Sequence, residues 1–177
     1  MSKKQKKTGF PTIIFRIILI SLLLTGTMTT VIGIDRIENY YEPYIFGIVF
    51  GGPGLALGIL IALKSKPYIN ENNDYINLFL SILIFLFGIF LFTGSLINEK
   101  VSKIENSDHY VVTNKYRQKS GYRTPEINSL IIDVNGFPHR LICSYSYWKK
   151  INTGQTINLN FYTSKLGFDY MKLPDEK

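Results

Sequence analysis

The first part of the chain has the hydrophobic pattern of helices that face lipid. Three long apolar stretches occur there, at residues 11–34, 44–63 and 75–97. A bilayer core is about 30 Å thick, which a helix crosses in about 20 predominantly apolar residues. Arg16 is the only full charge within these stretches. The pattern therefore predicts three transmembrane helices between residues 11 and 97.

The remainder of the chain alternates between apolar and polar positions. From Thr156 to Tyr162 every second side chain is apolar, as in a half-buried strand. Asn135-Gly136 separates two apolar runs and favours a two-residue hairpin turn, because both residues tolerate positive φ. Further strand candidates are Tyr110–Arg117 and Gly167–Leu173. About five strands are expected.

These strands are expected to form a small antiparallel β-sheet or open-barrel domain at residues 109–177. Residues 98–108 are charged and lack a clear alternation, so we expect a connector, either helical or irregular. The predicted fold class is membrane α + β, in which three transmembrane helices are followed by this β-rich domain.

The basic side chains of the short flanking segments predict the orientation, since segments rich in Lys and Arg stay in the cytoplasm. The N-terminal tail, residues 1–10, has four lysines and no acidic residue, and the loop after the second stretch has Lys64 and Lys66. Residues 35–43 carry Arg36 with three acidic residues. We therefore expect a multi-pass protein with a basic cytoplasmic tail and an extracytoplasmic β-rich domain.

The first apolar stretch follows a lysine-rich start, as in a signal peptide. It is long, however, and no Ala-x-Ala-like cleavage pattern follows it, so we expect an uncleaved helix. Arg16 lies little more than one turn after Pro11, and its side chain can reach the interface. The alternative is a buried functional charge. Tyr40, Tyr41 and Tyr44 are expected at the outer membrane interface.

The second apolar stretch carries small residues at three- and four-residue intervals, which place them on one helix face: Gly47, Gly51, Gly54, Gly58 and Ala62. Such a face lets another helix backbone approach closely in a bilayer. That helix could belong to this chain, to a second copy or to a different protein. Pro53 is expected to bend the helix, because it leaves the carbonyl of Val49 without an amide donor. In the third stretch, Ser81, Gly88 and Ser95 predict a narrow contact seam.

Two clusters of basic and aromatic residues stand out in the β-rich domain. The first consists of Lys115, Tyr116, Arg117, Lys119, Tyr122 and Arg123, and the second of Tyr145, Tyr147, Trp148, Lys149 and Lys150. Either cluster could bind anionic headgroups, a polysaccharide or an acidic protein surface. The alternative is a solvated strand edge, because lysine-rich edges also prevent unwanted strand pairing.

Little in the sequence suggests enzyme or metal chemistry. Cys143 is the single cysteine, and the two histidines are far apart in the sequence. We find no phosphate-binding loop, nucleophile elbow, His-Glu-x-x-His pattern or carboxylate pair in the sequence. We therefore expect no cofactor, no metal site and no catalytic residue, and we assign His139 and Cys143 to the core.

Together these patterns favour a non-catalytic integral membrane protein, an anchoring or assembly subunit that presents an extracytoplasmic β-domain for protein or envelope contacts. The expected partners are membrane lipid and either another membrane protein or a second copy of the chain. Nucleic acid is not expected, despite the net charge of +7. An immunity-type membrane protein that protects against a toxin is the alternative. A membrane enzyme of unknown reaction is a third possibility.

Overall fold

The computed structural model describes residues 12–69, 72–121, 126–134 and 136–174. They form two compact units. The helical unit contains the described residues up to 34 together with the described residues between 47 and 93. The sheet unit contains residues 35–46 and the described residues from 94 onward.

Among the described residues, three helices are long and apolar enough to cross a membrane, which confirms this part of the predicted fold. The first is α1 (Thr12–Ile37) and the third is α4 (Asn72–Val101). The second runs through α2 (Pro43–Phe46), the π-helical turn η1 (Gly47–Gly51), α3 (Gly52–Ser65) and the 3-10 turn η2 (Lys66–Tyr68). These helices fit a multi-pass membrane protein. The expected cytoplasmic tail lies outside the described residues.

The second helix changes its winding just before Pro53. Proline has no backbone N–H, so a regular α-helix would leave one carbonyl of the preceding turn without its donor. The turn η1 is wound more widely than an α-helix, as often occurs where the regular ladder of hydrogen bonds is interrupted. A π-helical turn therefore precedes Pro53, and the expected bend of the helix stays a prediction.

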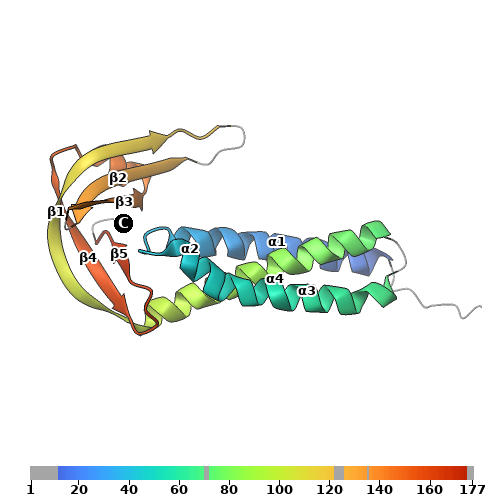
Figure 1. The fold of residues 1–177 in the computed structure, drawn as a ribbon. Coiled ribbons are helices and arrows are strands. Elements are labelled where there is room, and N and C mark those ends of the chain that lie inside the picture. Colours follow the sequence, from blue (N-terminus) through green and yellow to red (C-terminus); the bar gives the residue numbers. More distant parts are fainter. Residues whose placement is uncertain (1–11, 70–71, 122–125, 135, 175–177) are drawn as a thin grey trace, which may run out of the picture. The chain divides into compact units, whose positions relative to one another are not determined.

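Helices α1, α3 and α4 run side by side in the helical unit (Figure 1). A Cβ atom added to Gly26 of α1 would lie 2.6 Å from backbone atoms of Phe85, and one added to Gly88 of α4 would lie 2.6 Å from the Gly26 carbonyl oxygen. A Cβ added to Gly54 of α3 would lie 2.6 Å from the carbonyl oxygen of Leu86. Helix α4 therefore packs closely against both α1 and α3 through glycine.

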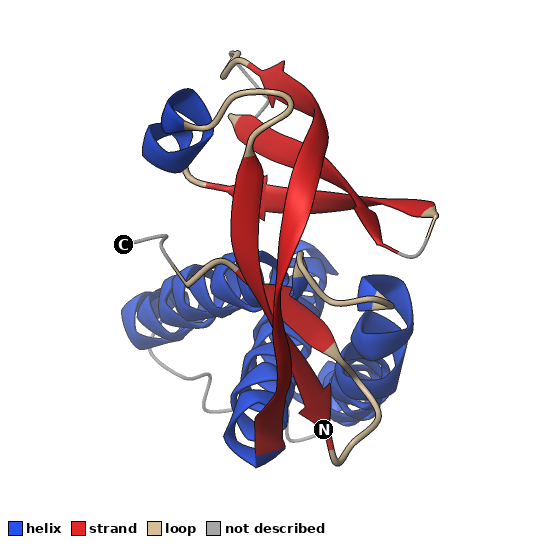
Figure 2. Ribbon diagram, turned by 90° about the vertical axis from the view of Figure 1, so that its left-hand side faces the viewer, coloured by secondary structure: helices blue, strands red, loops and turns tan. Residues whose placement is uncertain are grey.

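The sheet unit contains a five-stranded antiparallel sheet, which confirms the predicted β-domain. Its strands are β1 (Ser102–Gln118), β2 (Ile127–Val134), β3 (Phe137–Cys143), β4 (Thr156–Ser164) and β5 (Tyr170–Lys172). The strand order is β3-β2-β1-β4-β5. Strand β1 pairs with β4 through residues 102–111 and with β2 through residues 112–118. The sheet curls into a half-barrel (Figures 1 and 2).

Alternating side chains of the strands form the core of the sheet unit. Ile157 and Leu159 of β4 are buried, as their spacing predicts, and belong to one cluster with Leu130 and Leu141 of the β2–β3 hairpin. Gly136 has a φ of +85°, which suits the expected hairpin turn. The preceding Asn135 lies outside the described residues.

A short helix, α5 (Tyr145–Lys150), follows β3 and was not predicted. The Ser144 side chain accepts a hydrogen bond from the Tyr147 N–H and so caps the start of the helix. Tyr147 and Ile151 are buried in the sheet core. Ser144 is the local signal for this helix.

Residues 98–108, expected as a helical or irregular connector, are helical up to Val101 and belong to a strand from Ser102 onward. Helix α4 continues to Val101, and β1 begins at Ser102 without an intervening loop. From Lys103 to His109 the side chains of β1 are exposed on both faces, so the sequence lacks the alternation of a half-buried strand. Backbone pairing with β4 holds this part of the strand.

The loop between α1 and α2 extends the sheet at both of its edges. Tyr40 forms an antiparallel bridge with Tyr170 of β5, and the Met171 N–H donates to the carbonyl of Asn39. The Asn39 side chain accepts from the N–H of Ile142 in β3 and donates to its carbonyl, at 2.8 and 3.0 Å. The loop therefore links β3 and β5, the two edge strands of the half-barrel.

This pairing buries Tyr40, one of the three tyrosines expected at the membrane interface, in the sheet unit. Its side chain is only 5% exposed and stacks on Tyr170, with ring centroids 5.1 Å apart. Tyr41 and Tyr44 are exposed, at 40% and 87%. Because the loop and the sheet form one unit, both lie on the same side of any membrane that the three helices cross.

Candidate functional site

Basic residues of β1 stack on aromatic residues of α5. The Lys115 ammonium lies 4.1 Å from the centroid of the Trp148 ring, and the Arg117 guanidinium carbon lies 4.1 Å from the centroid of the Tyr145 ring. Cation–π contacts stabilise such pairs by about 0.5–1 kcal/mol at exposed sites. The cationic–aromatic site is defined here as Lys115, Arg117, Tyr145, Trp148, Lys149 and Lys150.

The register of the sheet explains why the two sequence clusters meet. Lys115 pairs with Leu130, which belongs to the core, and Arg117 pairs with Asn128. Paired residues of antiparallel strands point to the same face, so both basic side chains continue the core face beyond its apolar part. The Lys115 ammonium also donates to the carbonyl of Ile151, directly after α5.

The cationic–aromatic site carries surplus positive charge. Arg117 forms an ion pair with Glu126, with an N–O distance of 3.0 Å. Lys149 and Lys150 are exposed, and α5 contains no acidic residue. Lys119, predicted as part of the first cluster, is exposed just after β1. Such a surface attracts anionic partners.

Trp148 adds an unpaired donor to this site. Its Nε1 atom is buried and has no hydrogen-bond partner among the described residues. Leaving a buried donor unpaired costs about 1–3 kcal/mol. An acceptor brought by a binding partner would offset part of this cost if it could reach Nε1.

Several predicted residues lie apart from this arrangement. Tyr116 points to the opposite face of β1, where the Arg140 guanidinium carbon lies 5.4 Å from its ring centroid. Tyr147 is buried in the core and is therefore not a surface contact. Tyr122 and Arg123 lie outside the described residues.

The small-residue face of the second helix is largely occupied by α4. Gly51 faces the Phe87 ring, and a Cβ atom added to Gly58 would lie 2.9 Å from the Leu83 side chain. Ala62 is fully buried. A Cβ atom added to Gly47, in contrast, would meet nothing within 4 Å. From Gly51 onward this face serves packing inside the chain.

The structure also shows the burial of the small residues predicted to form a contact seam on α4 and the exposure of the arginine in α1. Ser81, Gly88 and Ser95 are all buried. Arg16 is exposed and, with Asn77, lines an otherwise largely apolar groove of about 370 Å³ between α1 and α4. Its role as an interface anchor stays a prediction.

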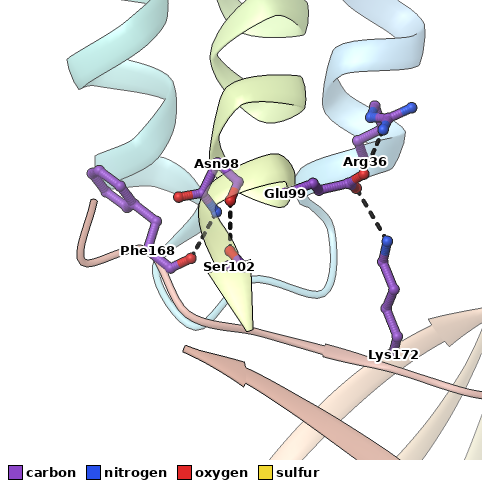
Figure 3. Close-up of polar contacts among 6 residues, drawn as sticks. All are labelled: Arg36, Asn98, Glu99, Ser102, Phe168 and Lys172. Atoms are coloured by element: carbon purple, nitrogen blue, oxygen red, sulfur yellow. Dashed lines mark hydrogen bonds and ion pairs between the residues drawn. The ribbon is translucent and has the colours of Figure 1, made fainter. Parts of the chain in front are cut away.

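A buried amide connects the end of α4 to the sheet (Figure 3). Asn98 is fully buried, and its side chain donates to the Phe168 carbonyl at 2.8 Å. Its side-chain oxygen accepts from the Ser164 hydroxyl at 2.6 Å. The Ser102 hydroxyl donates to the Asn98 backbone carbonyl at 2.5 Å. The bonds to Phe168 and Ser164 satisfy a polar side chain that would be costly to bury alone.

The neighbouring Glu99 joins two cations in the sheet unit (Figure 3). One carboxylate oxygen lies 2.5 Å from the Arg36 guanidinium at the end of α1, and the other lies 3.3 Å from the Lys172 ammonium of β5. Sequence reasoning missed this cluster. Its local signal is an Asn-Glu pair directly after an apolar stretch, but the partners are remote in the sequence.

Burial also perturbs a tyrosine of this region. Loss of water contact raises the pKa of Tyr40 to about 12 from its ordinary value of 10. The same cause raises the pKa of Tyr170, which stacks on it. Burial therefore favours the uncharged form of both hydroxyls.

The remaining candidate residues for metal binding or catalysis are the histidines, the cysteine and the carboxylates of the described residues. No group of three His, Cys, Asp or Glu side chains among them is placed to hold a metal ion. Cys143 is buried in the sheet core, and the His139 ring meets the Tyr41 ring edge-on, with centroids 5.3 Å apart. Comparison of the chain with protein-family models, with curated proteins and with solved structures finds no match.

Proposed function

We propose that the chain is a non-catalytic anchoring or assembly subunit, whose three helices hold a β-domain that binds an acidic surface of a partner protein. The stacking of Lys115 and Arg117 on the aromatic rings of α5 carries this proposal. Stacking restrains the two cations before a partner arrives, so binding loses less side-chain freedom.

The residue types of the site suit a protein partner. Trp, Tyr and Arg are enriched at the centres of protein interfaces, where they account for much of the binding energy. Trp148, Tyr145 and Arg117 would form this centre. Lys149 and Lys150 would lie at the rim, where exposed charges steer an oppositely charged partner and raise the association rate.

The glycine-rich helix is a weaker candidate for the contact surface. Gly54 and Gly58 are already packed against α4, so a second helix could not use them without displacing it. This supports the β-domain, rather than the small-residue face, as the place where a partner binds.

The proposed orientation is a cytoplasmic N-terminus and an extracytoplasmic β-domain. Its support is the lysine-rich character of the tail and of the loop with Lys64 and Lys66. A Cys143→Ser, Lys150→Cys variant treated in intact cells with a membrane-impermeant thiol reagent tests it. Labelling in intact cells is the expected result. Labelling only after lysis would reverse the orientation.

Photo-cross-linking in cells tests the binding site. A photoreactive residue at Tyr145 should yield an adduct with one discrete partner, and Lys149→Glu with Lys150→Glu should abolish it, because the substitutions reverse the rim charge. The matched control position is Phe137, which is 70% exposed in the same sheet unit. An adduct that survives the charge reversal, or that forms equally from Phe137, would contradict the proposal.

A further inference from the structure

The turn between β4 and β5 is fixed beside the last turn of a membrane-spanning helix. The Ser164 hydroxyl and the Phe168 carbonyl, at the two ends of this turn, both bond to the side chain of Asn98 in α4. Ser164 also pairs with Ser102, the first residue after the helix. Three contacts within the sheet unit therefore hold this turn next to the end of α4.

The length of α4 can be compared with the thickness of a bilayer. Its 30 residues extend over about 45 Å, at 1.5 Å per residue. A bilayer including its headgroup regions is about 40–45 Å thick. The last turn of α4 therefore lies among headgroups when the helix crosses the membrane, and the β4–β5 turn lies there with it.

The side chains at this level suit a lipid surface. Lys165 is exposed and Leu166 is 43% exposed in the turn. At the start of β1, Lys103 is exposed and Ile104 is 55% exposed. Aliphatic side chains next to lysines suit the boundary between acyl chains and phosphates.

Both lysines border one groove of about 360 Å³. Lys103 pairs with Thr163 of β4, and Lys165 is the first residue after β4, so the pairing brings both lysines to this groove. Glu105 also borders the groove, and its carboxylate accepts a hydrogen bond from the Thr163 hydroxyl. Two lysines against one carboxylate leave the groove with a net positive charge.

We propose that this groove binds the phosphate headgroup of an anionic phospholipid, with Lys103 and Lys165 contacting the phosphate and Ile104 and Leu166 entering the acyl boundary. An anionic lipid is chosen because the groove is positively charged and because Asn98 holds the β4–β5 turn beside the end of a membrane-spanning helix. The site does not depend on the proposed function, because the cationic–aromatic site uses other residues.

Lipid retention by the full chain is the first test. The protein is reconstituted in nanodiscs of phosphatidylcholine mixed equally with phosphatidylglycerol, and lipids that remain bound after release are identified by native mass spectrometry. Phosphatidylglycerol should be retained in preference to phosphatidylcholine. Lys103→Gln with Lys165→Gln should weaken this preference about tenfold or more, since each lysine near the surface attracts anionic lipid.

The matched control is Lys149→Gln with Lys150→Gln, which removes the same charge from α5. This control should retain the wild-type preference. An unchanged preference in the Lys103 and Lys165 variant, or an equal loss in the control, would overturn the proposal. Displacement of the lipid by excess inorganic phosphate would show a site for free phosphate and would also overturn it.

A depth measurement tests the site without changing the lysines. A fluorophore is attached to Leu166→Cys in a Cys143→Ser background and is exposed to lipids that carry a spin label at the headgroup. Strong quenching is expected for this position and weak quenching for a label at Phe137→Cys. Equal quenching at the two positions would contradict the placement of the turn at the membrane surface.

Discussion

The contacts inside the helical unit differ in kind from the contacts inside the sheet unit. Between the helices, Gly54 and Gly88 let backbones approach closely. In the sheet unit, Asn39 and Asn98 bond to groups that are remote in the sequence. Lipid provides no hydrophobic drive between helices, so close packing must hold them together. The sheet unit buries an apolar core from water and must pair the polar groups buried with it.

The two units should therefore fail in different ways when their contacts are changed. The helical unit should be sensitive to added volume, and the sheet unit should be sensitive to lost hydrogen bonds. The substitutions below test this contrast, from the largest expected effect to the smallest.

Asn98→Ala should destabilise the sheet unit most, by about 2–4 kcal/mol, because it leaves the Phe168 carbonyl and the Ser164 hydroxyl without their partner. Hydrogen exchange of the full chain in detergent should accelerate in β4 and β5. Asn106→Ala, an exposed position on β1, is the control and should leave exchange unchanged. Equal exchange in the two variants would contradict a supporting role for Asn98.

Gly54→Ala should destabilise the helical unit by about 1–3 kcal/mol, since the new methyl group would lie 2.6 Å from the Leu86 carbonyl oxygen. This loss should occur even though alanine favours a helix more than glycine does. Thermal unfolding followed by circular dichroism measures it. Gly52→Ala, whose Cβ meets nothing within 4 Å, should not lower the Tm. An unaltered Tm for Gly54→Ala would show that the helices can separate without cost.

Tyr40→Phe should make the sheet unit less sensitive to alkaline pH. The folded-state pKa of Tyr40 is raised to about 12 from 10, so folding favours the neutral hydroxyl. This contribution is fully present below pH 10 and is lost as the pH rises towards 12. The midpoint of alkaline unfolding should therefore move upward in Tyr40→Phe and stay unchanged in Tyr44→Phe, a substitution of an exposed ring. A downward shift would contradict this prediction.

Glu99→Gln should have the smallest effect, a loss of about 0.2–1 kcal/mol, because the side chains of Glu99, Arg36 and Lys172 are 20%, 29% and 47% exposed. Added salt should narrow the difference from the wild type. Chemical unfolding at low and high ionic strength measures both. Glu42→Gln, at an exposed position in the same region, is the control. A loss that persists in high salt would show that the hydrogen bonds of Glu99 outweigh its charge.

The features that the sequence predicted are those with a local pattern. Long apolar stretches indicated the three helices, and alternation around Ile157 and Leu159 indicated β4. The beginning of β1 was missed because both of its faces are exposed, and the Tyr40 pairing was missed because its partner is β5. A strand exposed on both faces and a pairing between remote residues produce no periodic pattern of apolar residues in the sequence.

The candidate site was predictable only in part. Both clusters were visible as basic and aromatic residues, and Lys115, Arg117 and Trp148 do meet. The exclusion of Tyr116 and Tyr147 required the strand register and the helix α5, which decide the direction of each side chain. The spacing of residues within one segment does not show which residues of another element lie next to them.

The pairing of the α1–α2 loop with the sheet has a consequence for how the protein is made. Asn39 and Tyr40 are synthesised long before Ile142 and Tyr170, their partners. At ribosomal rates the interval is on the order of ten seconds. During that time α3 and α4 are also synthesised, and the loop must remain unpaired until its partner strands follow. If translation stopped before β5, the α1–α2 loop would therefore lack the strand with which it pairs.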